Sequence, residues 1–394
     1  MNPASTKNYK TFLSQISVGL VIGVVIACSP TKFNTSQKVS DVCDISVRSC
    51  VITNGFVDIV RDFKVGAGKV DILFVNDNSP SMSFEQKNMA ANFAGLIENL
   101  DSKEIDYRIA IVTTDLATTQ ANKLIAFGNG SKFLTNADVN RVGLFNQSII
   151  REETVKCEND VIRFAINNYG SGWRSDSRYK IAYTAQCPSA DERGLFTSNL
   201  VIKENSSSFL RADANLSVIL VSDEDERSGQ TNIFEANDRY ENFNFMMSES
   251  YPSKYWDFNS IIVKDNDCRA KQSLQIRDQE DASVVGASLG MEYAKLSNSA
   301  AKDIDNNPRP RGQILDICQS NYAQHFSTMA TNIGDAARLL TLGCDPVAAP
   351  TVERVSNPSQ PIAHTWNGKQ GILFPRGSEG IPVVVTYRCY KGVK

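Results

Sequence analysis

The sequence predicts an α/β fold with a doubly wound, mostly parallel sheet and a small β-rich extension at the C-terminus. Two observations lead to this fold class. Five short apolar runs are rich in β-branched residues without strict alternation, which is typical of strands covered on both faces. They lie at residues 70–75, 107–114, 216–222, 258–263 and 312–317. Segments with helical spacing separate them, and strands that alternate with helices favour a parallel sheet.

Three segments between the apolar runs predict helices, at residues 84–100, 152–168 and 321–333. In the first of them apolar side chains recur every three or four residues, at Met89, Phe93, Leu96 and Leu100. That spacing places them on one face of a helix. After residue 342 turn dipeptides separate short β-like runs, so we expect a β-rich extension over residues 343–394.

The composition describes an ordinary globular protein. The chain of 394 residues is 42% hydrophobic and 22% charged, and it can hold one large domain or two modest ones. Its formal net charge is −3, and it has no basic stripe that would indicate binding to nucleic acid. No phosphate-binding G-x-x-x-x-G-K-[ST] motif occurs in the sequence.

The N-terminus has the organisation of an export signal. Lys7 and Lys10 precede a twelve-residue apolar run at 16–27. This run is shorter than the roughly 20 residues that span a bilayer as a helix, but it suits the core of a signal peptide. It ends in the sequence VIAC, which resembles the bacterial lipobox and has its cysteine at Cys28.

The lipobox resemblance implies that residues 1–27 are removed and that Cys28 carries acyl chains. Two or three acyl chains anchor a protein stably to a membrane. We then expect residues 28–65, which are rich in Ser, Thr and Asn, to form a tether. Ser29 follows the cysteine in place of Asp, so we expect the outer membrane, with the domain facing the periplasm or the outside. A plain secretory leader is the alternative.

The other eight cysteines indicate disulfides. They are Cys43, Cys50, Cys157, Cys187, Cys268, Cys318, Cys344 and Cys389. An even number in an exported protein predicts four bridges, with 105 possible connectivities. No CxxC or Cys/His cluster has the spacing of a zinc site.

Oxygen-bearing side chains follow two of the predicted strands. Asp77, Ser79 and Ser81 come after the first predicted strand. The acidic run at 222–226 lies at the end of the strand predicted at 216–222. Loops at the carboxyl edge of a parallel sheet bind ligands, and carboxylate and hydroxyl oxygens suit Mg²⁺. The alternatives are a chance D-x-S-x-S pattern and a solvated acidic loop.

The segments DILFVNDNSPSM, YRIAIVTTD and VILVSDEDE resemble the von Willebrand factor type A (VWA) domain with its metal-ion-dependent adhesion site. They are most similar to bacterial lipoproteins of that family. The resemblance covers residues 66–342. It implies that Asp77, Ser79, Ser81 and Asp223 hold Mg²⁺, or Mn²⁺ or Ca²⁺ in its place. It also implies that an acidic side chain of a partner protein completes the metal shell.

The chain departs from the family pattern at two positions. Pro80 stands where glycine is common, and Ser189, six residues before Leu195, stands where the family usually has a threonine. Ser189 is therefore a candidate fifth ligand. Ser189 and Glu192 also form the S-x-x-E pattern of a helix capping box, which is the structural alternative.

The family's sheet order places the strands at 258–263 and 312–317 side by side. Parallel neighbours end at the same edge of a sheet, about 4.7–4.9 Å apart, so we expect the bridge Cys268–Cys318. Proximity in sequence leads us to expect three further bridges, Cys157–Cys187, Cys344–Cys389 and Cys43–Cys50.

One enzyme signature competes with the adhesion site. Residues 286–290 form G-x-S-x-G around Ser288, and His325 follows later, with Asp303, Asp305 and Asp316 between them. The apolar run before this motif is short for a central strand of a hydrolase. We therefore expect a binding protein and no enzyme. A metal-free scaffold of the cell envelope is the second alternative.

Overall fold

The computed structural model describes residues 43, 47–116, 123–189, 191–205, 208–227, 234–252, 254–275, 287–303, 307–319 and 321–391. The predicted leader and the lipid attachment at Cys28 lie outside the described residues. Within the described ranges no helix has both the length and the apolar character needed to cross a membrane.

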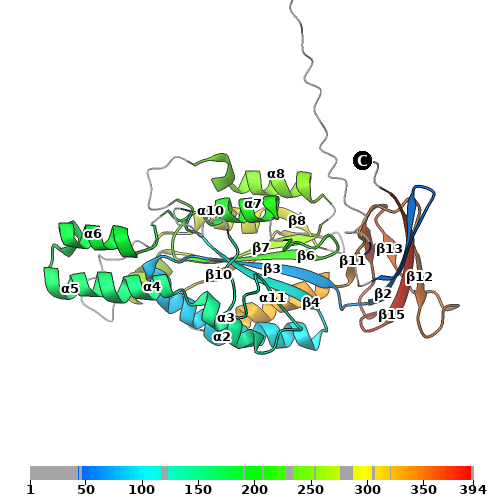
Figure 1. Ribbon diagram of the computed structural model, residues 1–394, viewed down its shortest axis with the longest axis horizontal. Helices are drawn as coiled ribbons and strands as arrows, with labels where there is room; N and C mark the ends of the chain where they lie inside the picture. The colour runs from blue at the N-terminus through cyan, green and yellow to red at the C-terminus, as the bar shows by residue number, and fades with distance from the viewer. Residues whose placement is uncertain are drawn as a thin grey trace, which may run out of the picture. The chain divides into compact units, whose positions relative to one another are not determined.

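A six-stranded sheet forms the centre of the structure (Figure 1). Its strand order is β10-β7-β6-β3-β4-β5, and every pairing is parallel except that of β4 with β5. The bounds are β3 Lys69–Asn76, β4 Asp106–Thr113, β5 Leu134–Thr135, β6 Asn215–Ser222, β7 Trp256–Ile262 and β10 Ile314–Asp316. The five predicted apolar runs thus supply β3, β4, β6, β7 and β10.

Helices cover both faces of this sheet (Figure 1). One face packs against α2 (Ser83–Ser102), α3 (Arg141–Ile149) and α11 (Ala323–Ala336), and the other against α7 (Gly194–Glu204), α8 (Tyr240–Ser250) and α10 (Met291–Asn298). Alternate residues of a strand point to opposite faces. In β3, Ile72 and Phe74 therefore enter one core, while Leu73 and Val75 enter the other.

A helical arm lies between β4 and α7 in sequence. It consists of α4 (Glu152–Lys156), the π-helical segment η2 (Cys157–Arg163), α5 (Phe164–Tyr169), the 3₁₀ turn η3 (Trp173–Ser175) and α6 (Ser177–Gln186). Outside the arm, the described chain also contains η1 (Pro80–Met82), η4 (Ala236–Asp238) and α9 (Asn266–Gln275). The arm contains the helix that the sequence predicted at 152–168.

A β-rich layer adjoins the amino end of β3. Four antiparallel strands have the order β1-β2-β15-β12, with bounds Val47–Thr53, Phe56–Lys64, Pro382–Tyr390 and Thr351–Arg354. A second antiparallel sheet contains β11 (Leu339–Thr341), β14 (Gly371–Leu373) and β13 (Thr365–Trp366). The two sheets share one hydrophobic core. A separate two-stranded antiparallel sheet joins β8 (Ala300–Lys302) to β9 (Pro308–Pro310).

The predicted fold class is wrong as a description of the described chain. The structure is mixed α/β, and three of its four described sheets are antiparallel. The β-rich part is also not confined to residues 343–394, because it takes β1 and β2 from the segment assigned to the tether. In β2 buried and less buried residues alternate, which is the pattern of an antiparallel strand with one covered face.

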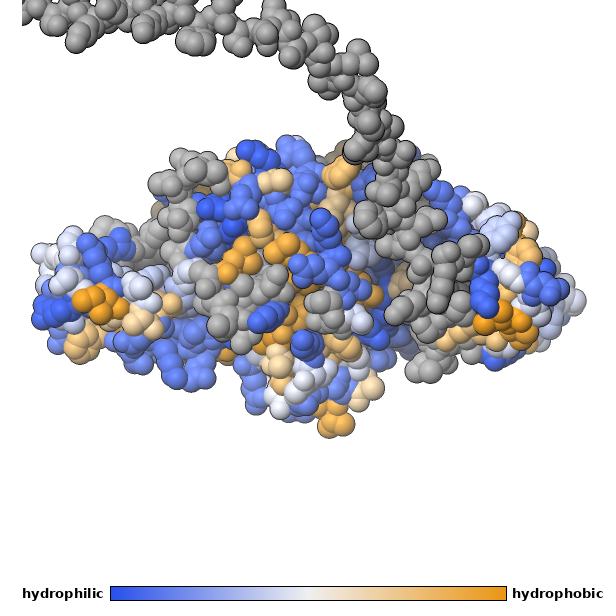
Figure 2. All heavy atoms as spheres, turned by 45° about the horizontal axis from the view of Figure 1, so that its top comes forward, coloured by the Kyte–Doolittle hydropathy of each residue, from blue (hydrophilic) through white to orange (hydrophobic). Residues whose placement is uncertain are grey.

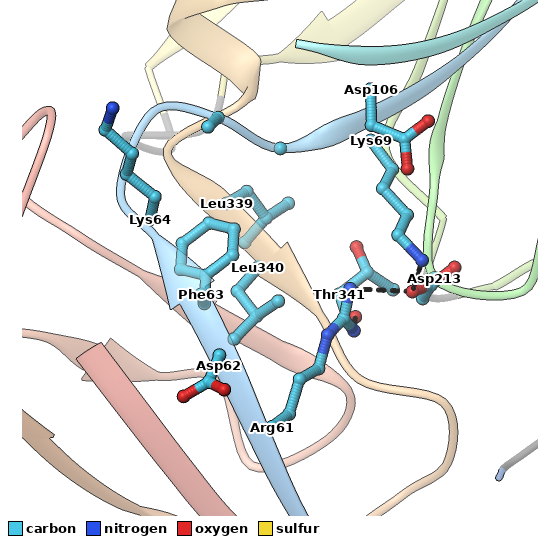
Figure 3. Close-up of a pocket in the computed structure, with 12 residues that line it drawn as sticks. Arg61, Asp62, Phe63, Lys64, Lys69, Asp106, Asp213, Leu339, Leu340 and Thr341 are labelled. Atoms are coloured by element: carbon cyan, nitrogen blue, oxygen red, sulfur yellow. Dashed lines mark hydrogen bonds and ion pairs between the residues drawn. The ribbon is translucent and has the colours of Figure 1, made fainter. Parts of the chain in front are cut away.

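Buried charges fix the junction between the β-rich layer and the central sheet (Figure 3). Arg61 of β2 contacts the Asp213 carboxylate at 2.7 Å, and Lys69 of β3 contacts the same carboxylate at 2.9 Å. Arg61 also donates to the backbone oxygen of Thr341 in β11. These residues line a cavity of about 120 Å³. Asp213 therefore neutralises two cations that come from different sheets.

Four disulfides cross-link the described chain, which confirms the prediction of disulfide bonds. The Cys268–Cys318 bridge joins the segments that follow β7 and β10, with Cα atoms 5.5 Å apart. The other bridges also join pairs that the sequence analysis named, and they are Cys43–Cys50, Cys157–Cys187 and Cys344–Cys389.

Candidate metal centre

The candidate centre lies where the strand order of the central sheet reverses. β3 and β6 are neighbours, but the chain continues from β3 to β4 on one side and from β6 to β7 on the other. Loops that leave two adjacent parallel strands in opposite directions create a crevice at their carboxyl ends, where such sheets bind ligands. Asp77 follows β3 at this edge, and Asp223 follows β6.

Hydrogen bonds join the two loops into one cluster. Asp77 accepts from the Ser79 amide at 2.8 Å on Oδ1 and from the Ser222 hydroxyl at 2.6 Å on Oδ2. The Ser79 and Ser81 hydroxyls share a hydrogen bond of 2.8 Å. Ser81 then donates to Asp223 Oδ1 at 3.0 Å. The structure therefore brings together Asp77, Ser79, Ser81 and Asp223.

One carboxylate oxygen in this cluster lacks a partner. Asp223 is fully buried, and its Oδ2 has no hydrogen-bond donor. Burial, and then the negative charge of Asp77, raise the pKa of Asp223 well above its usual range. A buried charged oxygen without a partner is costly, and a cation would remove that cost. Hydroxyl and carboxylate oxygens are a donor set that fits Mg²⁺.

Ser189, the candidate fifth ligand, is held by Asp115. Its hydroxyl donates to Asp115 Oδ1 at 2.6 Å, and its amide donates to Oδ2 at 3.2 Å. The capping-box alternative for Ser189 and Glu192 is wrong, because α7 starts at Gly194 and its first amides are bound elsewhere. Glu226 accepts from the backbone amides of Leu195 and Phe196 at 2.9 and 3.1 Å. Glu226 therefore caps this helix.

Glu192 lies beside the centre instead, which the sequence analysis missed. Its carboxyl group lies near Asp77 and accepts a hydrogen bond from the Thr114 hydroxyl. Burial, and then the charges of Asp77 and Glu224, raise the pKa of Glu192 well above its usual range. Thr114 directly follows β4, just as Asp77 follows β3. This position directly after a predicted strand could have identified Thr114 from the sequence. No sequence signal identifies Glu192, because only the folding of the chain brings it to the centre.

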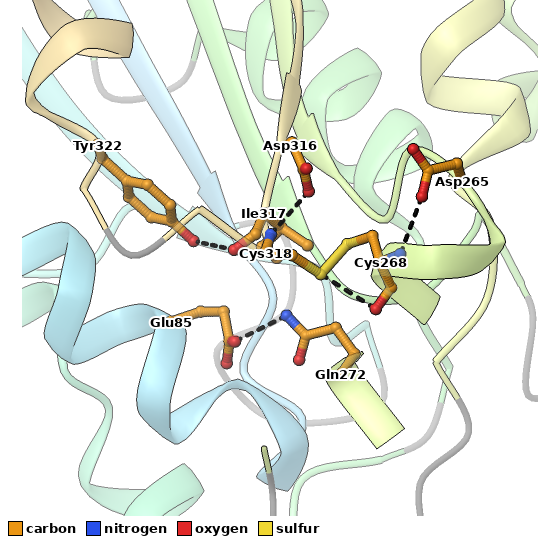
Figure 4. Close-up of a disulfide and its surroundings, with 8 residues drawn as sticks. All are labelled: Glu85, Asp265, Cys268, Gln272, Asp316, Ile317, Cys318 and Tyr322. Carbon is orange, nitrogen blue, oxygen red and sulfur yellow. Dashed lines mark hydrogen bonds between the residues drawn. A yellow bond between two sulfur atoms is a disulfide. The ribbon is translucent and has the colours of Figure 1, made fainter. Parts of the chain in front are cut away.

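A further buried acid, Glu85 of α2, faces Gln272 of α9 (Figure 4). Gln272 of α9 donates from Nε2 to Oε1 of Glu85 in α2 at 2.8 Å, while Glu85 Oε2 and Gln272 Oε1 have no partners. Burial raises the pKa of Glu85 to about 7, and the charges of Asp77 and Glu158 add to this effect. Protonation of Glu85 removes its charge and turns one carboxyl oxygen into a donor, which lowers the cost of its burial.

The Cys268, Asp316 and Cys318 side chains form a group compact enough for a metal ion. Their sulfur atoms are joined in a disulfide, however, and metal ions bind the thiolate form of cysteine. The Asp316 carboxylate is also engaged, because it accepts from the Cys318 amide at 2.9 Å (Figure 4). We therefore assign no metal site there.

The surroundings of the G-x-S-x-G motif differ from those of a hydrolase nucleophile elbow. Gly286 and Asp305 lie outside the described residues. The Ser288 amide donates to the backbone oxygen of Asp223 at 2.9 Å, and Ser288 is not among the described residues with positive φ. A nucleophile elbow places its serine on a strained turn. His325 is buried in α11 and stacks on Tyr322.

Comparisons with known proteins assign no family. No family model and no curated protein matches the chain. A pilus adhesin, SpaC of Lactobacillus rhamnosus GG in its open conformation, is 10% identical, with 86% of this chain and 41% of that chain covered and a TM-score of 0.31. Proximal thread matrix protein 1 of the mussel byssus is 10% identical, with 71% and 48% covered and a TM-score of 0.31.

A third solved structure, the human COPII-coat protein Sec24c, is 8% identical, with 83% of this chain and 41% of that chain covered and a TM-score of 0.28. The present chain spans less than half the length of each of these three proteins.

Proposed function

We propose that the protein binds a divalent cation, Mg²⁺ in the first place, and uses it to bind an acidic side chain of a partner protein. The ligands would come from Asp77, Ser79, Ser81 and Asp223, as in the metal-ion-dependent adhesion sites that the loop sequences resemble. The observation that carries the proposal is the buried Asp223 Oδ2, which has no donor and lies in a cluster of oxygen-bearing side chains.

The chain's own residues support such a site by orienting its oxygens. Ser222 and the Ser79 amide hold the Asp77 carboxylate from both sides. Ser81 fixes one oxygen of Asp223 and leaves the other free. A bound cation would supply the positive charge that offsets these carboxylates and attracts another one.

The surrounding charges make the proposed binding depend on the cation. Asp77, Glu192 and Asp223 are all fully or almost fully buried acids at one edge of the sheet. Without a cation the edge offers a partner's carboxylate no positive charge, because burial raises the pKa of all three acids and favours their neutral forms. With the cation bound, the same edge would attract it. The site would therefore select partner proteins that present an acidic side chain.

We also propose that the protein is a lipoprotein of a bacterial outer membrane, anchored at Cys28. This part of the proposal rests on the leader and its VIAC sequence. A lipid anchor at the N-terminus would hold the chain at a membrane, and the cation-dependent site would bind the partner.

Calorimetry on the full chain in detergent tests the metal proposal. After removal of divalent ions with EDTA, Mg²⁺ should bind at one site per chain, and Asp77→Ala should abolish that binding. Glu249→Ala, which removes an exposed carboxylate from α8, is the matched control and should leave binding unchanged. Absence of Mg²⁺ binding to the unmodified chain at millimolar concentration would contradict the proposal and favour a metal-free scaffold.

A further inference from the structure

The helical arm exposes a surface that its own packing does not explain. Its α6 has no fully buried side chain. Ile181 of α6 is 71% exposed and Phe164 of α5 is 50% exposed. In Figure 2 apolar side chains lie among hydrophilic ones at the left of the view, where Figure 1 places α5 and α6. This surface is available to a partner.

Aromatic rings and arginines make up much of the arm. Trp173 packs edge-on against Tyr179, with ring centres 4.7 Å apart, and Tyr179 lies 5.7 Å from Tyr183. The Arg178 guanidinium lies 4.0 Å above the ring of Tyr169. Tyr, Trp and Arg are the residue types most enriched among those that dominate binding energy at protein interfaces. Trp173 itself is buried, so these rings fix the shape of the arm, and a partner can contact the exposed Arg174 and Arg178.

Hydrogen bonds attach the first segments of the arm, α4 and η2, to residues that follow β3. Thr154 of α4 donates to the backbone oxygen of Asn78 at 2.7 Å, between Asp77 and Ser79. The Ser83 hydroxyl donates to Glu158 of η2. The disulfide Cys157–Cys187 then closes the arm on itself. These contacts hold the arm in a fixed position relative to Asp77, Ser79 and Ser81.

The α6 end of the arm is basic, although the whole arm at residues 152–186 is balanced, with five acidic and five basic residues. Residues 170–187 contain Arg174, Arg178 and Lys180 but one acid, Asp176, which pairs with Arg178. Arg174 and Lys180 are exposed. Complementary charges guide a partner to a binding surface and exclude partners of the wrong sign. This end of the arm thus favours a partner that carries carboxylates in addition to the one at the cation.

We infer that the helical arm is the second contact surface for the partner, and that the partner presents a segment with several acidic side chains next to an apolar one. One carboxylate completes the metal shell, another faces Arg174 and Lys180, and the apolar side chain packs on Ile181. This inference rests on the proposed function. It adds the chemical class of the partner and the surface that selects it.

A random copolymer of glutamate and tyrosine is a suitable probe, because it offers both carboxylates and rings. Its binding to the immobilised full chain is measured in millimolar Mg²⁺. The double variant Arg174→Glu/Lys180→Glu and the variant Ile181→Asp should each weaken binding at least about tenfold, as loss of a main interface contact does.

Matched controls place the same changes elsewhere on the surface. Lys203→Glu/Lys264→Glu gives the same net charge, and Phe245→Asp places an acid at a residue that is 62% exposed on α8. Both should bind the copolymer like the unmodified chain. Equal binding by the arm variants and these controls would overturn the inference, as would failure of the unmodified chain to bind the copolymer.

Asp77→Ala separates this inference from the function on which it rests. Loss of copolymer binding in Asp77→Ala together with loss in the arm variants supports both. Loss in Asp77→Ala with full binding by the arm variants overturns the arm alone. Full binding by Asp77→Ala with loss in the arm variants overturns the cation-dependent function and leaves the arm as an acid-binding surface.

Discussion

The Ser81 hydroxyl donates a hydrogen bond of 3.0 Å to Asp223, although the two residues are 142 positions apart in the chain. This contact joins the loop after β3 to the loop after β6. It satisfies Oδ1 of Asp223 and leaves Oδ2 buried without a partner. The candidate centre is therefore organised around an acid whose second oxygen the chain itself does not satisfy.

Asp223→Asn should separate cation binding from fold stability. The amide cannot ionise, so the cost of burying an acid whose pKa is raised disappears, and we expect the cation-free protein at neutral pH to gain roughly 1–3 kcal/mol in its free energy of unfolding. Mg²⁺ binding should be lost at the same time. Urea unfolding in EDTA and calorimetry with Mg²⁺ measure the two effects. A destabilised variant with normal Mg²⁺ affinity would contradict the assigned role of Asp223.

Glu85 should make the stability of the cation-free protein depend on pH. Its pKa is about 7 in the folded chain against an ordinary value of 4.5, so the folded state binds more protons between these values. The stabilisation is complete below pH 4.5 and is lost as the pH rises through about 7. We expect a loss on the order of 3 kcal/mol in the free energy of unfolding.

Glu85→Gln should flatten this pH dependence, because an amide mimics the protonated acid and can pair with Gln272. Urea unfolding in EDTA from pH 5 to pH 8 provides the measurement. Glu98→Gln, at an exposed position of the same helix, is the control and should keep the slope of the unmodified chain. An unchanged slope in Glu85→Gln would show that another group is responsible.

Asp213→Ala should strongly destabilise the protein. It leaves Arg61 and Lys69 buried without their shared carboxylate, and removal of one partner of a buried ion pair costs about 3–5 kcal/mol. Asp62→Ala is the matched control, because its ion pair with Arg48 is more than half exposed and should contribute at most about 1 kcal/mol. Equal effects in chemical unfolding would mean that the junction charges do not stabilise the fold.

Cys28→Ser should release the protein from the membrane fraction. Without the cysteine no acyl chain can be attached, and the apolar leader is too short to span a bilayer. Cell fractionation and immunoblotting of the variant and the unmodified chain measure the distribution. Cys43→Ser, which removes another cysteine near the N-terminus, controls for general effects of cysteine loss. Membrane attachment of Cys28→Ser at the original level would argue against the anchor.

Sequence reasoning identified the parts of this protein that have a local signal. The apolar runs that became β3 and β6 are buried on both faces, and that burial leaves a continuous pattern in the sequence. Asp77, Ser79 and Ser81 were found because they are close together and follow such a run. The resemblance to the VWA domain added Asp223 to this set, and the parallel pairing of β3 with β6 accounts for their contact in the structure.

The features that sequence reasoning missed depend on the path of the folded chain. Val57 and Ile59 of β2 alternate with less buried residues, but their partner strand lies near the other end of the sequence. Glu192 reaches Asp77 because the helical arm returns the chain to the sheet edge. No local pattern encodes that return.

The pairing of β2 with β15 constrains the order of folding. Asp58 of β2 and Arg388 of β15 form an ion pair across 330 positions, and the two strands pair along their whole length. β2 is synthesised early, whereas its partner β15 is the last strand of the described chain. Until then one edge of the β1–β2 hairpin is unpaired and can associate with other chains. Loss of β15 would therefore expose that edge permanently, although every residue of the candidate centre would still be present.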